Sequence, residues 1–133
     1  MPGPRLRPTN NPRNRVRLIG GTWRGRVLAF PDAPGLRPTP DRVRETLFNW
    51  LGQDLSGWRV VDAFAGSGAL GFEAASRGAA EVLLLEQDPA LVALLNASRE
   101  RLKAQTLRVQ QAQPVRTEQD AKQQQQDNAR NLQ

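Results

Sequence analysis

Apolar residues in the N-terminal third of the chain form two short patterned stretches. From 17 to 30 they alternate with polar residues around three glycines, which predicts a short hairpin. From 40 to 51 they recur at helical spacing behind Thr39, a good N-cap, and Pro40, which is tolerated as a first helical residue. Gly52 ends this predicted helix, and its apolar face comprises Val43, Leu47, Phe48, Trp50 and Leu51.

The middle of the chain alternates strand-like and helix-like patterns. Gly78 is a helix-stop signal, and Asp88 followed by Pro89 is a helix start. The predicted elements are a strand at 58–63, a helix at 69–77, a strand at 81–86, a helix at 89–103 and a strand at 106–110. This order predicts a right-handed parallel α/β unit with a nucleotide-type site at the strand ends.

The two ends of the chain lack such patterns. Of the residues from 105 to 133, ten are Gln, and only four are large and apolar. Residues 1–14 hold four Pro and three Asn, again without a core-forming pattern. Segments of this composition bury too little surface to offset the entropy of ordering, so both ends are expected to be disordered.

The amino-acid composition excludes several kinds of catalytic and metal-binding site. The chain has 133 residues and no His, Cys or Tyr. It therefore has no thiolate nucleophile, no Ser-His pair, no ordinary zinc site and no disulfide. No stretch has the length and apolarity of a secretory signal or a membrane span, so we expect a cytoplasmic protein without a metal or a membrane partner.

Positive charge is concentrated at the N-terminal end. Residues 1–44 hold ten Arg and two acidic residues, whereas the remaining residues hold nine basic and eleven acidic ones. A basic arm beside a nearly neutral body favours a polyanionic partner such as nucleic acid. Within the arm, Arg42, Arg44 and Glu45 occupy the polar face of the predicted helix, where they either contact RNA or pair with one another, and mutual pairing is the first expectation.

The most informative motif follows the strand at 58–63. Gly66 and Gly68 permit a tight turn with bare backbone facing a ligand, and Gly71 lets the next helix pack closely on the sheet. The N–H groups at the start of that helix would face a carboxylate or phosphate. Glu86, at the end of the next strand, can accept both hydroxyls of a ribose. Asp62, four residues before the first of these glycines, can hold an ammonium group.

Two cofactors fit this spacing to different degrees. The glycines match G-x-G-x-x-G, so a nicotinamide-dinucleotide-binding oxidoreductase is one alternative. Asp62 would repel a pyrophosphate, however, and the chain lacks the His, Tyr or Cys that hydride transfer would use. S-adenosylmethionine has an amino-acid end for Asp62 and a ribose for Glu86, so it is the predicted cofactor.

Three blocks of the sequence resemble a known family. Read in order, RLIGGTWRGRVLAFPDAPGLRPTPDRVRETLFNWL, VVDAFAGSGALGFEAASRGA and VLLLEQD resemble the RsmD family of bacterial S-adenosylmethionine-dependent methyltransferases, over about residues 17–109. The resemblance implies methylation of the exocyclic N2 of a guanine in 16S ribosomal RNA. It also implies a Rossmann-like, three-layer αβα fold, preceded by a hairpin and a helix.

The resemblance assigns residues to two sites. Asp62, Phe64, Gly66, Gly68 and Gly71 would form the cofactor loop, with Glu86 at the ribose. The hairpin and the GLRPT segment would face the RNA or the small ribosomal subunit, through Arg24, Arg26, Arg37 and Arg42.

The chain departs from the family after its third strand. The family continues with an acidic or amide position near the adenine, for which only Gln111 or Gln113 is available, and then with Asp/Asn-Pro-Pro-aromatic, which is absent. No catalytic residue is therefore assigned, and the chain is interpreted as a truncated or frameshifted product with an incomplete parallel sheet. A non-catalytic RNA-binding module is the main alternative function.

These inferences divide the chain into four parts. They are a disordered basic tail at 1–14, an RNA-facing hairpin and helix at 15–57, a partial cofactor-binding domain at 58–111 and a disordered Gln-rich tail at 112–133. In an incomplete sheet the strand at 58–63 would have an unpaired apolar edge. We therefore expect self-association through that edge.

Overall fold

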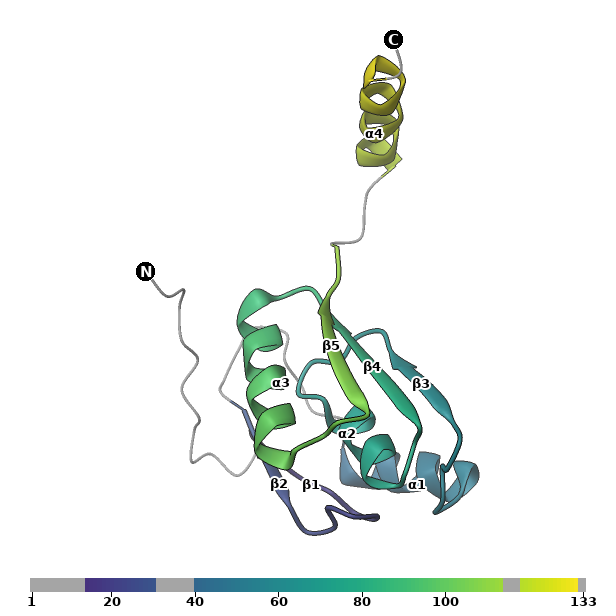
Figure 1. The fold of residues 1–133 in the computed structure, drawn as a ribbon, viewed down its shortest axis with the longest axis vertical. Helices are drawn as coiled ribbons and strands as arrows, with labels where there is room; N and C mark the ends of the chain where they lie inside the picture. Colours follow the sequence, from purple (N-terminus) through teal and green to yellow (C-terminus); the bar gives the residue numbers. More distant parts are fainter. Residues whose placement is uncertain (1–13, 31–39, 114–117, 132–133) are drawn as a thin grey trace.

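The fold is an α/β unit preceded by a small hairpin and a helix (Figure 1). The computed structural model describes residues 14–30, 40–113 and 118–131. Its elements are β1 (Arg15–Arg17), β2 (Val27–Ala29), α1 (Asp41–Leu51), β3 (Arg59–Asp62), α2 (Ala69–Ser76), β4 (Glu81–Glu86), α3 (Pro89–Leu102), β5 (Leu107–Gln111) and α4 (Glu118–Asn131).

β3, β4 and β5 form a parallel sheet in that spatial order. The sequence predicted all three strands and the two helices that connect them, with β4 at the same residues and the other elements within one or two residues. α3 begins as predicted, because Asp88 caps it by accepting a hydrogen bond from the Ala90 N–H at 2.9 Å. The α/β class and the parallel connectivity are thus confirmed.

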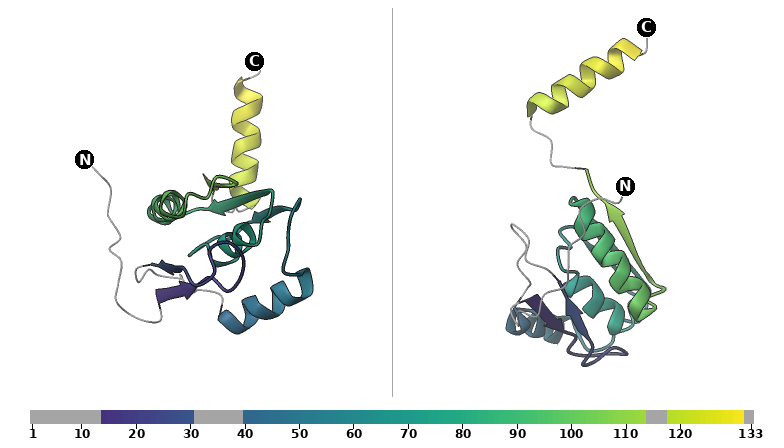
Figure 2. Two further views of the ribbon diagram at one scale, coloured as in Figure 1. Left: turned by 60° about the horizontal axis from the view of Figure 1, so that its bottom comes forward. Right: turned by 90° about the vertical axis from the view of Figure 1, so that its left-hand side faces the viewer.

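The helices α2 and α3 cover one face of this sheet. Val82 and Leu84 of β4 and Leu107 of β5 are fully buried on that face. Leu83, which alternates with them on β4, is only partly buried, and Val61 of β3 is exposed. The described residues therefore supply two layers of the expected three-layer fold, the sheet and the helices on one side of it (Figure 2).

The hairpin consists of two antiparallel three-residue strands, β1 and β2. Val16 and Leu28 face each other in its register and are both buried, while Arg15 and Arg17 on either side of Val16 are exposed. Such a short ribbon is not stable on its own, so its position depends on contacts with the rest of the fold.

The helix α1 shows where helical periodicity misled the sequence analysis. It begins at Asp41, with Pro40 at the cap position, while Thr39 lies outside the described residues. Phe48 is buried as expected, but Val43, Trp50 and Leu51 of the predicted apolar face are exposed. Arg44 was expected on the polar face, and this was wrong: its side chain is completely buried.

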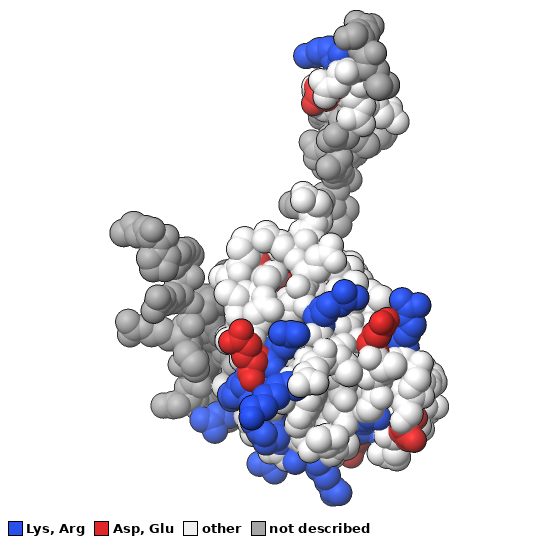
Figure 3. All heavy atoms as spheres, in the orientation of Figure 1, with Lys and Arg blue, Asp and Glu red and all other residues white. Residues whose placement is uncertain are grey.

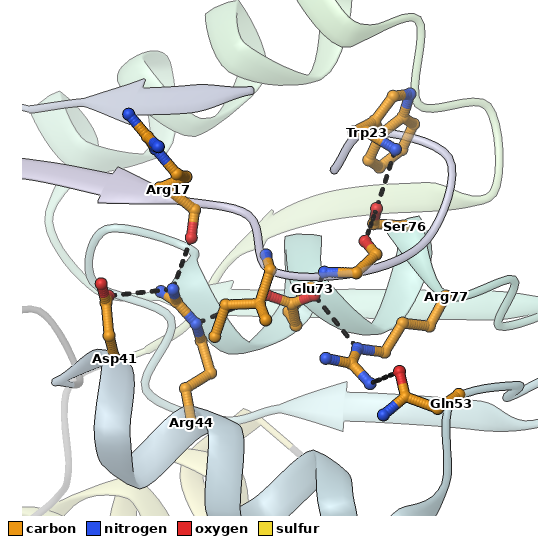
Figure 4. Close-up of polar contacts among 10 residues, drawn as sticks. Arg17, Trp23, Asp41, Arg44, Gln53, Glu73, Ser76 and Arg77 are labelled. Atoms are coloured by element: carbon orange, nitrogen blue, oxygen red, sulfur yellow. Dashed lines mark hydrogen bonds and ion pairs between the residues drawn. The ribbon is translucent and has the colours of Figure 1, made fainter. Parts of the chain in front are cut away.

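The reason is a buried carboxylate, Glu73 of α2, which lies between two guanidinium groups (Figure 4). Arg44 Nε lies 3.4 Å from Glu73 Oε1, and Arg77 Nε donates to Glu73 Oε2 at 3.1 Å. Arg77 also packs over the ring of Phe48, 4.8 Å from its centroid, and donates to Gln53. A buried charge is tolerated when it is paired and hydrogen-bonded in this way.

The same carboxylate holds the chain that leaves β1. The backbone N–H groups of Ile19 and Gly20 donate to the two Glu73 oxygens at 2.9 and 3.0 Å. Arg44 adds a second connection, since its Nη2 donates to the Arg17 carbonyl and to Asp41 Oδ1. Glu73 and its cationic partners therefore join the hairpin, α1 and α2, three elements that are far apart in sequence.

Ser76, one helical turn after Glu73, completes the attachment of the hairpin. Its hydroxyl donates to the Gly20 carbonyl at 2.6 Å and accepts from the Trp23 N–H at 2.9 Å. Gly21 lies so close to this end of α2 that a Cβ atom there would be 1.8 Å from the Ser76 carbonyl oxygen. The Gly20-Gly21 pair thus permits close docking of the hairpin on the end of α2.

The structure has a helix, α4, in the segment where the sequence analysis expected no regular structure. Gln, Lys, Ala and Glu are good helix formers, and the Gln123 side chain donates to Asp127 one turn later, at 3.2 Å. Figures 1 and 2 show α4 standing apart from the sheet and from the other helices. Local helix propensity accounts for it, and the boundary at 112 stays a prediction.

We predict that Glu73→Gln lowers the free energy of unfolding by about 3–5 kcal/mol, because it removes the buried counter-charge that two buried guanidinium groups share and leaves Arg44 with only the exposed Asp41. The matched control is Glu45→Gln, at an exposed position of α1, which should change it by less than about 0.5 kcal/mol. Urea denaturation followed by circular dichroism measures both. Equal effects of the two substitutions would contradict the role assigned to Glu73.

Candidate cofactor site

A tight turn joins β3 to α2 at the carboxyl end of the sheet. Gly66 and Gly68 both adopt positive φ, 54° and 83°, which the turn requires and other residues rarely tolerate. A Cβ atom on Gly68 would lie 2.7 Å from the Phe72 ring and 2.8 Å from Leu95. The turn is thus pressed against α2 and α3. Gly66 stays partly exposed, whereas Gly68 is buried, so close packing rather than approach of a ligand accounts for a glycine at position 68.

Glu86 lies beside this turn, at the end of β4. One oxygen, Oε1, accepts from the Gly66 N–H at 3.0 Å, and the other accepts from the Asp88 N–H at 3.0 Å. A carboxylate has about four lone-pair sites, so each oxygen can accept a further hydrogen bond. Glu86 can therefore hold the turn in place and also receive two hydroxyl groups of a ligand.

Asp62, the last residue of β3, supplies a second carboxylate. Burial raises the pKa of Asp62, and the negative charge of Glu86 raises it further, while backbone N–H groups of Phe64 and Gly71 oppose the shift. The Phe64 N–H lies 3.4 Å from Asp62 Oδ1. A carboxyl group that is partly desolvated and close to a second acid gains most from a cationic partner. An ammonium group of a ligand would meet this requirement.

Four other residues were predicted at the cofactor site, Gly71 and Phe64 in its loop and Gln111 or Gln113 near the adenine. Gly71 lies inside α2, where a Cβ atom would be 2.0 Å from Leu84 Cδ2, so its close packing on the sheet is confirmed. The Phe64 side chain is 81% exposed. Gln111 pairs with Glu86 across β4 and β5, and its side chain donates to the Gln87 carbonyl at 3.3 Å. Gln113 is exposed just beyond β5.

The arginines predicted to face RNA lie on two elements. Arg24 and Arg26 are exposed on the connection between β1 and β2, and Arg42 is exposed in the first turn of α1. Arg37 lies outside the described residues. Figure 3 shows basic side chains gathered over the hairpin and the adjoining end of α3. Arg101 of α3 reaches the hairpin, where its Nη2 donates to the Val27 carbonyl at 2.8 Å.

The sequence analysis missed the residues that hold this arm in place. Glu73 and Ser76 lie in an Ala-rich helix and Arg77 directly follows it, and polar side chains at such positions are expected to face solvent. The available signal was the composition of α2, ALGFEAAS, in which only Glu73 and Ser76 are polar. A helix that is apolar on nearly every side is itself buried, and a charge inside it needs a buried partner.

The described residues show neither a membrane span nor a cluster of metal ligands. No helix among them has the length and apolarity to cross a membrane. No group of three or more Asp and Glu side chains in the same residues is placed to hold a metal ion.

Comparisons with known proteins identify relatives of this chain. The family model described as "Conserved hypothetical protein 95" matches residues 16–132. The chain is 52% identical over 103 residues to a protein of Escherichia coli strain K12 named ribosomal RNA small subunit methyltransferase D, and the match covers 77% of this chain and 52% of that protein. A protein of the same name from Haemophilus influenzae is 50% identical over 95 residues, which cover 71% of this chain and 49% of that one.

A solved structure of a similar protein has the same fold over most of this chain. A putative methyltransferase from Escherichia coli superimposes with a TM-score of 0.68 at 48% identity, covering 74% of this chain and 53% of the other. The chain thus spans about half the length of the relatives that it matches. Together the family model, the relatives and the fold show that the chain belongs to the RsmD family of methyltransferases with a Rossmann-like fold.

Proposed function

We propose that this chain binds S-adenosylmethionine at the turn between β3 and α2, and that it contributes the cofactor-binding and RNA-contacting parts of an enzyme that methylates guanine N2 in 16S ribosomal RNA. The observation that supports it most is the convergence of two carboxylates on a glycine turn, with Glu86 bonded directly to the Gly66 N–H at 3.0 Å. The names of the relatives support a ribosomal RNA substrate.

The residues present fit this cofactor. Glu86 has acceptor capacity for both ribose hydroxyls, and Asp62 has the charge and the raised pKa that suit an ammonium partner. Gly66 is partly exposed, so a ligand can approach the backbone of the turn there, and N–H groups at the start of α2 favour a carboxylate. Phe64 is exposed in the turn and Gln111 pairs with Glu86, so both would be available to border the rest of the ligand.

The role of these residues is positioning. The chemistry supplied by bound S-adenosylmethionine would be a methyl group activated by its sulfonium charge, which needs no nucleophilic side chain of the protein. The chain's residues would orient that methyl group toward the acceptor amine, and the main catalytic contribution would be alignment. No catalytic residue is assigned, since the Asp/Asn-Pro-Pro-aromatic motif is absent from the chain.

The arm would bind the RNA backbone. Arg24 and Arg26 on the hairpin and Arg42 on α1 are exposed, and Arg37 belongs to the same proposed set. Guanidinium groups form two parallel hydrogen bonds to phosphate oxygens, which suits this composition. Because Glu73 and Ser76 fasten the hairpin to α2, the proposed RNA surface is attached to the helix that follows the cofactor turn.

We predict that calorimetry detects binding of S-adenosylmethionine and that Glu86→Ala weakens it about 10- to 100-fold, the equivalent of about 1.5–3 kcal/mol for hydrogen bonds to a charged group. The matched control is Glu81→Ala, at the exposed start of the same strand, which should leave the affinity unchanged. Thermal unfolding of each variant checks that the fold is intact.

Two other results would replace this proposal. A flat titration of folded protein that still binds RNA would indicate a non-catalytic RNA-binding module. Tight binding of NAD in place of S-adenosylmethionine would favour the nicotinamide-dependent oxidoreductase.

We predict that replacing Arg24 and Arg26 with Gln weakens binding to a 16S ribosomal RNA fragment and reduces its salt dependence. Each lost phosphate contact lowers the slope of log K against log salt by about one. Arg130→Gln on α4 is the control, because α4 stands apart from the hairpin. Fluorescence anisotropy at several salt concentrations measures the slopes, and unchanged slopes in the hairpin variant would exclude these contacts.

A further inference from the structure

Basic side chains gather where the C-terminal end of α3 meets the hairpin (Figure 3). Arg101 and Lys103 at this end are exposed, and so are Arg24 and Arg26 on the connection between β1 and β2. Arg101 Nη2 donates to the carbonyl of Val27, the residue after Arg26, at 2.8 Å. Two elements that are far apart in sequence thus present their positive charges side by side. We call Arg24, Arg26, Arg101 and Lys103 together the α3–hairpin surface.

The charges of this surface lack acidic partners in the part of the chain that the structure describes. No carboxylate there forms an ion pair with any of its four members, whereas the exposed Arg59 of β3 is paired with Glu81 at 2.8 Å. Glu100 is exposed in the last turn of α3 and is the acidic residue next to Arg101 in sequence. Several unpaired cations on one surface favour a partner that carries a row of negative charges.

Stabilisation of the helix end does not account for Arg101. Basic residues in the last turn of a helix interact favourably with its dipole. Arg101 instead reaches the hairpin, while Arg99 of the same turn reaches β5, where its Nε donates to the Leu107 carbonyl. A guanidinium group has five N–H donors, and the contact with Val27 uses one of them. Arg101 is therefore held in a fixed position with donors left for a ligand.

Lys103 occupies a backbone position that favours glycine. Its φ of 54° and ψ of 45° are left-handed, and no other non-glycine residue of the described chain has a positive φ. Its N–H ends α3 by donating to the carbonyls of Arg99 and Glu100. Glycine is the usual residue at such a helix end, because a side chain makes this conformation less stable. A lysine that is kept in a strained conformation suggests that its side chain has a function.

We propose that the end of α3 binds RNA phosphates together with the hairpin, as an anchoring contact away from the nucleotide that is methylated. This rests on the RNA substrate proposed above and adds Arg101 and Lys103 to its contacts. The guanidinium group suits two phosphate oxygens at once, and the lysine ammonium acts as a point charge.

The position of α3 separates this contact from the cofactor turn. α3 follows β4 at the carboxyl end of the sheet, where the turn lies, and its 14 residues are about 21 Å long. Its other end leads into β5 and therefore lies at the opposite edge of the sheet. Loss of the contact should weaken RNA binding without changing the affinity for S-adenosylmethionine.

Lys103→Gly separates RNA binding from stability. Glycine relieves the left-handed backbone and removes the charge, so this variant should unfold at the same temperature as the unmodified chain or higher, yet bind a 16S ribosomal RNA fragment more weakly. When Arg101→Gln is added, the slope of log K against log salt should fall by about two, one for each phosphate contact. Arg108→Gln is the matched control and should leave the slope unchanged, because Arg108 is exposed on the face of β5 opposite to the buried Leu107.

Fluorescence anisotropy at several salt concentrations measures the slopes, and thermal unfolding measures the stability. Glu100→Gln should change the affinity in the opposite direction, since it removes a negative charge beside the α3–hairpin surface. If the chain binds RNA through Arg24 and Arg26 while the double variant keeps the unmodified slope, the anchoring contact is wrong and the proposed function stands. A folded chain that binds no RNA at all would overturn both.

Discussion

The buried carboxylate of Glu73 is the interaction on which the arrangement of this chain depends. It is completely enclosed, and it is neutralised by Arg44 from α1 and Arg77 from its own helix, with two N–H groups from the segment after β1. Each partner would be costly to bury alone, so the elements that carry them are stable only together. The three-residue strands of the hairpin gain a fixed position in this way. The basic arm is thus held by charge and hydrogen bonding as well as by its buried apolar side chains, Val16, Leu18, Leu28 and Phe30.

The helix α2 connects the hairpin, which Glu73 holds, to the cofactor turn. Its second half binds the hairpin through Glu73 and Ser76, and its first residue follows Gly68 of the turn. Eight residues of helix are about 12 Å long, so the two proposed binding surfaces are separated by one short rigid element. Gly71 brings that element against Leu84 of β4, which ends at Glu86. The position of Glu86 beside Gly66 therefore follows from the packing of α2 on the sheet.

Local patterns in the sequence predicted most of the elements, because these depend on neighbouring residues. The apolar run of β4, the Asp88 cap and the glycines of the turn each act within a few positions of the chain. The burial of Arg44 could not be predicted from local patterns, because a helical pattern assigns a charged residue to the solvent side. Its partner Glu73 lies far along the chain. The hydrogen bonds from Ile19 and Gly20 to Glu73 span 54 and 53 residues, a separation at which no local rule operates.

Hydrogen exchange of individual backbone amides in the native protein tests most directly whether Glu73 joins the arm to α2. If it does, the Ile19 and Gly20 amides should exchange as slowly as the Phe72 amide inside α2, because all three become accessible in the same opening. The Arg24 amide, in the exposed connection of the hairpin, should exchange much faster. Exchange of Ile19 and Gly20 at the rate of Arg24, with Phe72 still protected, would contradict the account.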